Sequence, residues 1–200
     1  MLLFTAPAEG PDGGVALFAW RWSLETSAPD DEPLLLLPRV GDVLDVAVAV
    51  DAPLDADGAE PGGAGAQEVR VAVLAAEPDP NGQPDGQPDG QPAGTLLLTT
   101  LRLSGERVIA DAPVRLAPER AYREPRVFLA PEGRDAYVLA RDERDDYLVL
   151  TSSGGGGALR LAGYAADLDA VLAFSASGRV SLVRVHPDEG LLVVGLEEGD

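Results

Sequence analysis

Short apolar runs, rich in Val and Leu, recur along this chain between clusters of Gly, Pro, Asp and Ser. From Leu44 to Val50 every second residue is Leu or Val, so the apolar side chains fall on one face of an extended strand. Such alternation is typical of antiparallel sheets, in which each sheet buries one side against another layer. The pattern therefore predicts an all-β protein.

The predicted strands divide the chain into two halves. In the first half they cover 15–24, 33–37, 43–50, 68–74 and 95–103. In the second half, apolar runs recur about every ten to twelve residues, a spacing typical of a meander. They centre near Val127, Val138, Leu148, Leu159, Val171, Val183 and Val193.

The fold that we expect is an antiparallel β-sandwich or two small β-subdomains, with a C-terminal meander. Residues 1–104 form the sandwich-like N-terminal half in this interpretation, and 105–200 form the C-terminal antiparallel β-meander half. One continuous domain is the alternative. The segment 164–174 also fits a helical face, and a short helix there would not change the class.

Two segments, 51–67 and 77–94, lack the apolar pattern and are predicted to be long surface loops. The second contains three copies of Gly-Gln-Pro, starting at Gly82, Gly86 and Gly90. Such a repeat has little apolar area to bury, and its prolines interrupt any hydrogen-bonded ladder. A solvated hairpin tip is the simpler interpretation, and a recognition spike is the alternative.

The charge of the chain is strongly one-sided. It has no lysine, and fifteen arginines face thirty-four carboxylates, for a formal net charge of -19. This field repels nucleic acid and anionic membrane surfaces, so neither is expected as a partner. Adaptation to high salt and a GC-rich coding bias both account for the composition.

Compartment is only weakly constrained by the sequence. The chain has no cysteine, which excludes disulfides, a thiolate nucleophile and cysteine-bound zinc. The apolar run at 1–7 lacks a basic flank and is too short for a signal peptide or an anchor. We therefore expect no membrane insertion, and a protein that is cytoplasmic or part of an assembled particle.

An acidic group in the first loop invites a calcium hypothesis, because hard cations bind several oxygen ligands from one flexible loop. Its members are Asp51, Asp55, Asp57 and Glu60. If Gly58 takes the place of the EF-hand glycine, Pro53 and Ala64 fall where the first and last ligands belong. We therefore expect no metal and no other cofactor, with an irregular calcium site as the alternative.

Catalytic signals are sparse. The single histidine, His186, precedes a proline in a predicted turn, and no Gly-x-Ser-x-Gly elbow activates a serine. Function requires a constellation of groups rather than a fold, and none is recognisable here. We expect a protein that is not an enzyme.

Two groups of residues are candidates for binding. Phe18, Trp20 and Trp22 share one face of a predicted strand. Core packing is the expected role of such large aromatics, and an exposed platform for sugar rings or a partner is the alternative.

The second group is Arg115, Arg120, Arg123 and Arg126. These arginines concentrate positive charge within one short stretch of an acidic chain, and guanidinium forks pair bidentately with carboxylates. Docking onto a protein partner or a second copy, and pairing with acids of the same chain, fit the sequence equally well.

The functional expectation is a noncatalytic structural or interaction module, an accessory subunit that decorates a virion, an appendage or a surface layer. A carbohydrate-binding module that uses the aromatic stripe is the first alternative. A hydrolytic or metal-dependent enzyme is the second.

Overall fold

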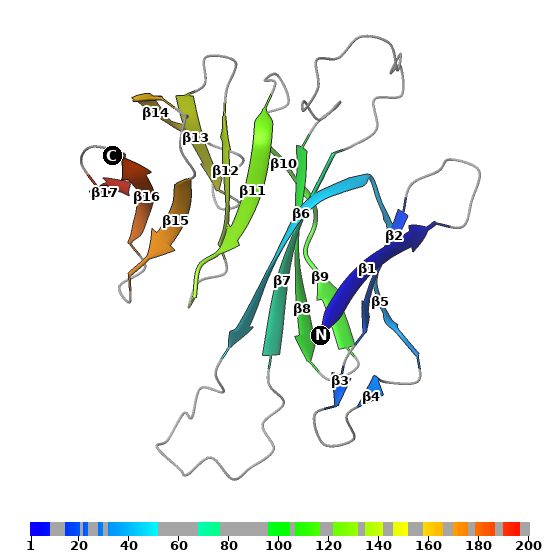
Figure 1. Cartoon of the computed structure of the whole chain (residues 1–200). Coiled ribbons are helices and arrows are strands. Elements are labelled where there is room, and N and C mark those ends of the chain that lie inside the picture. Colours follow the sequence, from blue (N-terminus) through cyan, green and yellow to red (C-terminus); the bar gives the residue numbers. More distant parts are fainter. Residues whose placement is uncertain are drawn as a thin grey trace, which may run out of the picture.

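The computed structural model describes residues 1–8, 15–20, 22–23, 28–29, 32–51, 68–76, 96–104, 107–116, 122–131, 135–141, 146–151, 158–165, 170–175, 179–186 and 190–196. Within this part of the chain, every regular element is a strand, and all strand pairs are antiparallel (Figure 1). The predicted all-β fold with sandwich-like sheets is confirmed.

The N-terminal sheet has the order β1-β2-β5. Its strands are β1 (Leu2–Pro7), β2 (Val15–Trp20) and β5 (Leu34–Val40). A separate two-stranded ribbon pairs β3 (Trp22–Ser23) with β4 (Ala28–Pro29).

The five-stranded sheet has the order β10-β8-β7-β6, and β9 also pairs with β8. Its strands are β6 (Asp42–Asp51), β7 (Glu68–Ala76), β8 (Leu96–Ser104), β9 (Arg107–Ala110) and β10 (Val114–Leu116). Because β10 pairs with the first residues of β8 and β9 with its last, these two short strands lie end to end along one edge.

Two meanders complete the chain. The four-stranded sheet runs β11 (Arg123–Leu129), β12 (Ala136–Arg141), β13 (Asp146–Thr151) and β14 (Ala158–Ala165). The C-terminal sheet runs β15 (Ala170–Phe174), β16 (Val180–His186) and β17 (Gly190–Leu196).

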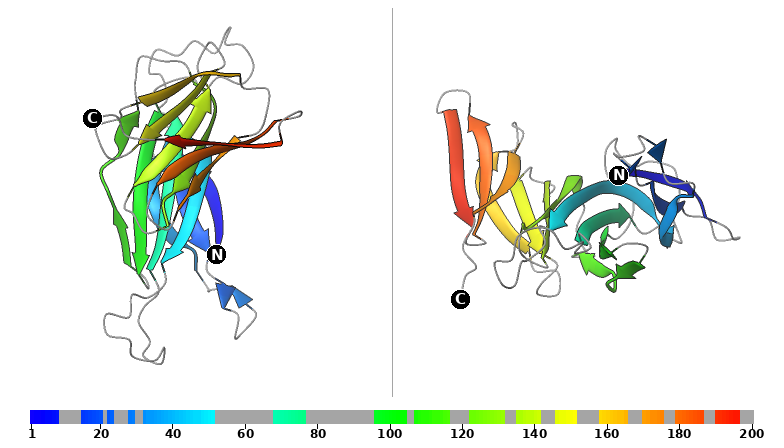
Figure 2. Two further views of the ribbon diagram at one scale, coloured as in Figure 1. Left: turned by 90° about the vertical axis from the view of Figure 1, so that its left-hand side faces the viewer. Right: turned by 90° about the horizontal axis from the view of Figure 1, so that it is seen from below.

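The four sheets stack as successive layers, and the two inner ones are buried on both sides. On β7, Ala72 and Leu74 pack toward the four-stranded sheet, whereas Val71 and Val73 pack toward the N-terminal sheet. The four-stranded sheet likewise contributes to one cluster with the five-stranded sheet and to another with the C-terminal sheet. The N-terminal and C-terminal sheets are therefore the end layers, at opposite ends of the molecule (Figure 2).

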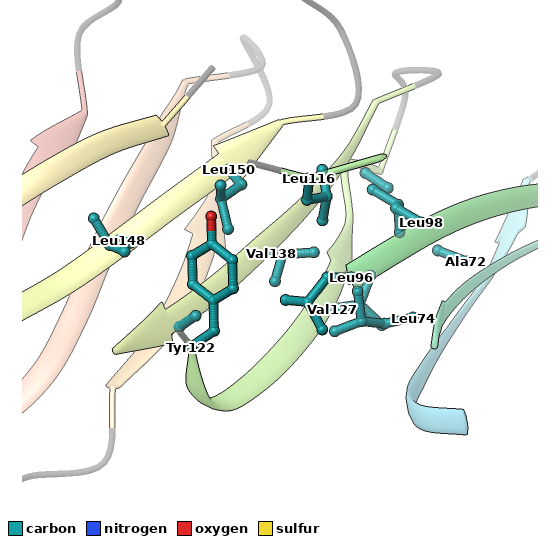
Figure 3. Packing of buried hydrophobic residues seen from close by; sticks show 12 residues of the cluster. Ala72, Leu74, Leu96, Leu98, Leu116, Tyr122, Val127, Val138, Leu148 and Leu150 are labelled. Atoms are coloured by element: carbon teal, nitrogen blue, oxygen red, sulfur yellow. The ribbon is translucent and has the colours of Figure 1, made fainter. Parts of the chain in front are cut away.

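The largest buried cluster joins the two inner layers (Figure 3). Leu96 and Leu98 of β8 meet Val138 of β12 and Leu148 of β13 in this cluster, all of them almost fully buried. Tyr122 packs into the same cluster from just before β11. This apolar contact holds the first and second halves of the chain together.

Two polar side chains bridge the same layers. The Arg70 guanidinium of β7 is buried and donates hydrogen bonds of 2.9 and 2.8 Å to the carbonyl oxygens of Ala130 and Pro131, just after β11. Asp45, beside a register shift in β6, accepts a 2.7 Å hydrogen bond from the backbone N–H of Val127 in β11. Both contacts give carbonyl or amide groups of the neighbouring layer a partner.

The expected boundary at 104/105 falls within one sheet. β9 and β10 follow this boundary yet pair with β8, and the core cluster of Figure 3 draws residues from both sides of it. The division into two folding units stays a prediction. The predicted loops at 51–67 and 77–94 lie outside the described residues, apart from Asp51 at the end of β6.

Candidate functional site

An aromatic group lies on the outer side of the N-terminal sheet. Leu17 and Ala19 of β2 point into the core, so their neighbours Phe18 and Trp20 point to the opposite side. Phe4 of β1 is the cross-strand partner of Phe18, which places its side chain on the same outer side.

The three rings form one contiguous group. The Phe4 and Phe18 rings are stacked at 5.4 Å between centroids with an interplanar angle of 13°, and Phe4 lies 5.8 Å from Trp20 at 45°. Such offset or tilted ring pairs stabilise each other beyond their shared buried area. All three side chains remain partly exposed.

Aliphatic side chains extend this group. Leu35 of β5 is the cross-strand partner of Phe18 on the other side, and Leu2 of β1 that of Trp20. Their exposures are 45% and 61%, so the described part of the chain leaves both largely uncovered. We call Leu2, Phe4, Phe18, Trp20 and Leu35 the aromatic face; none of these five side chains carries a charge.

The aromatic stripe predicted from the sequence is only partly retained. Phe18 and Trp20 belong to none of the three buried clusters, so they lie outside the core that we expected them to join. Trp22 is on β3, in the separate ribbon, and its side chain lies outside the described residues. A ligand-binding role of the stripe stays a prediction.

Sequence reasoning missed Phe4. It stands in the short apolar run at 1–7, where no strand is predicted, and its place on the aromatic face depends on the pairing of β1 with β2. Its spacing from Phe18 carries no local signal, because antiparallel partners are set by the intervening turn.

The predicted arginine group is divided between two sheets. Arg115 lies on β10, at the edge of the five-stranded sheet, whereas Arg123 and Arg126 lie on β11, at the edge of the four-stranded sheet. Each of these three takes part in an interaction within the chain. Arg120 lies outside the described residues, and docking through the group stays a prediction.

A charged corner surrounds the start of β11. Between Arg123 and Arg126 the pairing register shifts, and Glu124 adopts a positive φ of 47° there. Its carboxylate lies 3.5 Å from the Arg141 guanidinium, which in turn sits 5.9 Å from the centre of the Tyr147 ring. At this corner, arginine charge is therefore paired with a carboxylate and an aromatic ring of the same chain.

The hollow at this corner is too small for an organic substrate. It is lined by Glu124, Arg126, Leu139, Ala140, Arg141, Tyr147 and Ala170. Its volume of about 20 Å³ has room for roughly one water molecule. The corner therefore serves as a junction between β11, β12 and β13 rather than as a substrate pocket.

The acidic group of the first loop lies almost entirely outside the described residues. Asp55, Asp57 and Glu60 lie outside the described residues, and only the backbone of Asp51 is described, at the end of β6. Within the described ranges, no three His, Asp or Glu side chains are grouped as metal ligands would be.

Comparisons with known proteins found no family model and no curated protein that matches this sequence. The described part of the chain also contains no helix long and apolar enough to cross a membrane.

Proposed function

We propose that this chain is a noncatalytic interaction module, an accessory subunit that decorates or cements a larger assembly such as a virion, an appendage or a surface layer. The aromatic face is its docking surface in this proposal. Aromatic side chains are enriched at the centres of protein interfaces, where they supply most of the binding energy.

The observation that carries this proposal is the cluster of partly exposed aromatic rings on the surface of a strongly acidic chain. A chain of net charge -19 has abundant polar side chains to place on its surface. It nevertheless directs Phe4, Phe18 and Trp20 outward, between exposed Leu2 and Leu35. Contiguous exposed apolar groups of this kind mark interaction sites.

A carbohydrate ligand is the second candidate, because the same rings could stack on sugars. The chemistry of the aromatic face favours a protein partner. Leu2 and Leu35, which flank the rings, have no polar atoms to pair with sugar hydroxyls, and Phe4 and Phe18 each use one ring face against the other.

Photo-crosslinking tests the docking surface. Benzoylphenylalanine in place of Phe4 should form protein adducts when the chain is irradiated in extract of its native source. The same residue in place of Phe174, which packs between the inner and C-terminal sheets, is the matched control and should form few.

Equal labelling at both positions, or no adduct at Phe4, would contradict the proposal. Affinity electrophoresis through gels that contain soluble polysaccharides tests the carbohydrate alternative. Retardation that disappears in Phe18→Ala would assign the aromatic face to a glycan instead.

A further inference from the structure

Arginine side chains gather at the charged corner on one face of the four-stranded sheet. Leu139 and Tyr147 pack toward the C-terminal sheet. Arg126 is the cross-strand partner of Leu139, and Arg141 is that of Tyr147. Cross-strand partners point to the same side of a sheet, so both arginine side chains lie on the face toward the C-terminal sheet. Arg123 of β11 is the other cross-strand partner of Arg141 and lies on this face too.

The C-terminal sheet adds an arginine from the opposite layer. Ala170 of β15 lines the hollow at the corner and packs toward the four-stranded sheet. Arg184 of β16 is its cross-strand partner and alternates with Leu182, which packs in the same direction. The Arg184 side chain therefore points between the two layers as well, and its Nε atom is buried. Arginines of β11, β12 and β16 thus flank the same corner.

This concentration of positive charge is incompletely balanced by the described residues. Arg123 and Arg141 stand directly opposite each other, an arrangement of like charges that destabilises a sheet. Among the described residues that line the hollow, Glu124 is the single acid, and its carboxylate is 64% exposed. These arginines and Glu124 together carry a formal surplus of positive charge, in a chain whose net charge is -19. Such a local reversal of sign attracts anions.

Contacts within the chain leave these arginines able to bind a ligand. Arg123, Arg126 and Arg184 each take part in an interaction within the chain, and Arg141 lies 3.5 Å from Glu124. A guanidinium group carries five N–H donors, so one or two such contacts do not use all of them. Arginine is also weakly hydrated, which suits it to binding anions at partly buried positions.

We propose that the hollow at the charged corner binds a chloride ion. Its volume of about 20 Å³ has room for one particle of about the size of a water molecule. Chloride is a monoatomic anion only a little larger than water. Sulfate, phosphate and carboxylate groups each carry several oxygen atoms and exceed this volume, so the hollow favours a halide over them.

The bound chloride stabilises the contact between two layers. Arg126 and Arg141 line the hollow from the four-stranded sheet, and Arg184 adds positive charge from the C-terminal sheet. A negative ion between them offsets the repulsion among the guanidinium groups. Glu124 competes with the ion, because its carboxylate lies beside Arg141. This site is separate from the aromatic face and does not depend on the proposed docking function.

Chloride NMR tests the site, because exchange with a protein site broadens the line of the free ion. Wild-type protein should broaden the line, and added bromide should narrow it again by competition. Arg126→Gln should lower the affinity for chloride about threefold or more, and Glu124→Gln should raise it about threefold, since each changes one charge beside a partly exposed ion. Both residues are exposed, so both variants should fold.

Arg107→Gln is the matched control. It removes the same charge from an exposed position of β9 and should leave the broadening unchanged. Circular dichroism verifies that each variant folds, and Arg141→Gln is a second test of the loss should Arg126→Gln unfold.

Sodium sulfate at equal ionic strength separates binding in the hollow from general attraction to positive charge. Sulfate should narrow the chloride line much less than bromide does. Competition by sulfate as strong as that by bromide would overturn the inference, because the hollow would then not select the ion. No broadening by the wild type, or equal broadening by the wild type and all variants, would overturn it as well.

Discussion

At the scale of single residues, two side chains connect the inner layers more specifically than apolar packing alone. Arg70 spans from β7 to the carbonyl oxygens that follow β11, and Asp45 connects β6 to the amide of Val127. The aliphatic stem of an arginine packs well among apolar groups, while its guanidinium satisfies buried carbonyls. These two residues thus add directional hydrogen bonds to the apolar packing between the layers.

Replacing Arg70 with Met should lower the free energy of unfolding by about 2–3 kcal/mol, because two carbonyl oxygens lose a charged donor. Urea denaturation measures this change. Arg102→Met is the matched control, since Arg102 is the cross-strand partner of Arg70 and less buried. Equal losses in the two variants would refute the bridging role.

Asp45→Ala should cost about 1–3 kcal/mol, because the Val127 amide loses its acceptor inside the layer contact. The same side chain also accepts a 2.9 Å hydrogen bond from the amide of Val46, which holds the local register shift of β6. Asp42→Ala, at an exposed position of the same strand, should be near neutral. Similar thermal melting of both variants would show that the contact contributes little.

At the scale of elements, the sequence pattern predicts long periodic strands and fails for short edge strands. β6, β7 and β8 coincide closely with their predicted ranges because their alternation extends over many residues. β9 and β10 were not predicted, since four and three residues are too few to show a period. They form because β8 offers an open edge, which is a property of the sheet and not of their own residues.

The sequence pattern also does not predict which side of β2 faces the core. Both sides of β2 are apolar, so alternation separates Leu17 and Ala19 from Phe18 and Trp20 without showing which pair points inward. That choice depends on the side from which the five-stranded sheet covers β2. In the segment 164–174, which also fits a helix, the described residues 164–165 end β14 and 170–174 form β15, because β13 pairs with β14 and β16 pairs with β15.

Two glycines of β17 differ in backbone conformation. Gly190 begins β17 with a φ of +78°, whereas Gly195 has no positive φ, and an added Cβ meets no atom within 4 Å at either position. Gly190→Ala should therefore cost about 1–2 kcal/mol through backbone strain alone, and Gly195→Ala should be neutral or slightly stabilising. Denaturant melts of the two variants measure the difference, and equal stabilities would contradict it.

At the scale of the whole molecule, the net charge of -19 opposes close contact between copies of the chain. Self-repulsion also acts on the folded chain itself, since folding brings the carboxylates closer together. Solution ionic strength then controls both stability and association. The charge thus fits either a salt-rich environment or a composition set by coding bias.

The melting temperature should rise as sodium chloride increases from low to molar concentration, because screening relieves the repulsion among the carboxylates. Scanning calorimetry at low protein concentration separates this effect from association. Sucrose, which stabilises proteins without screening charge, is the control and should give a smaller rise. A melting temperature that does not respond to salt would leave coding bias as the explanation of the composition.

The central claim of this account is that the aromatic face is an open surface in the isolated chain. Acrylamide quenching of Trp20 emission tests it most directly, in a Trp22→Phe variant that leaves Trp20 as the sole tryptophan. Efficient quenching in dilute protein is the expected result, because Trp20 lies partly exposed on the outer side of β2. A Trp20 that is shielded from acrylamide in the dilute monomer would place the stripe in the core and contradict the account.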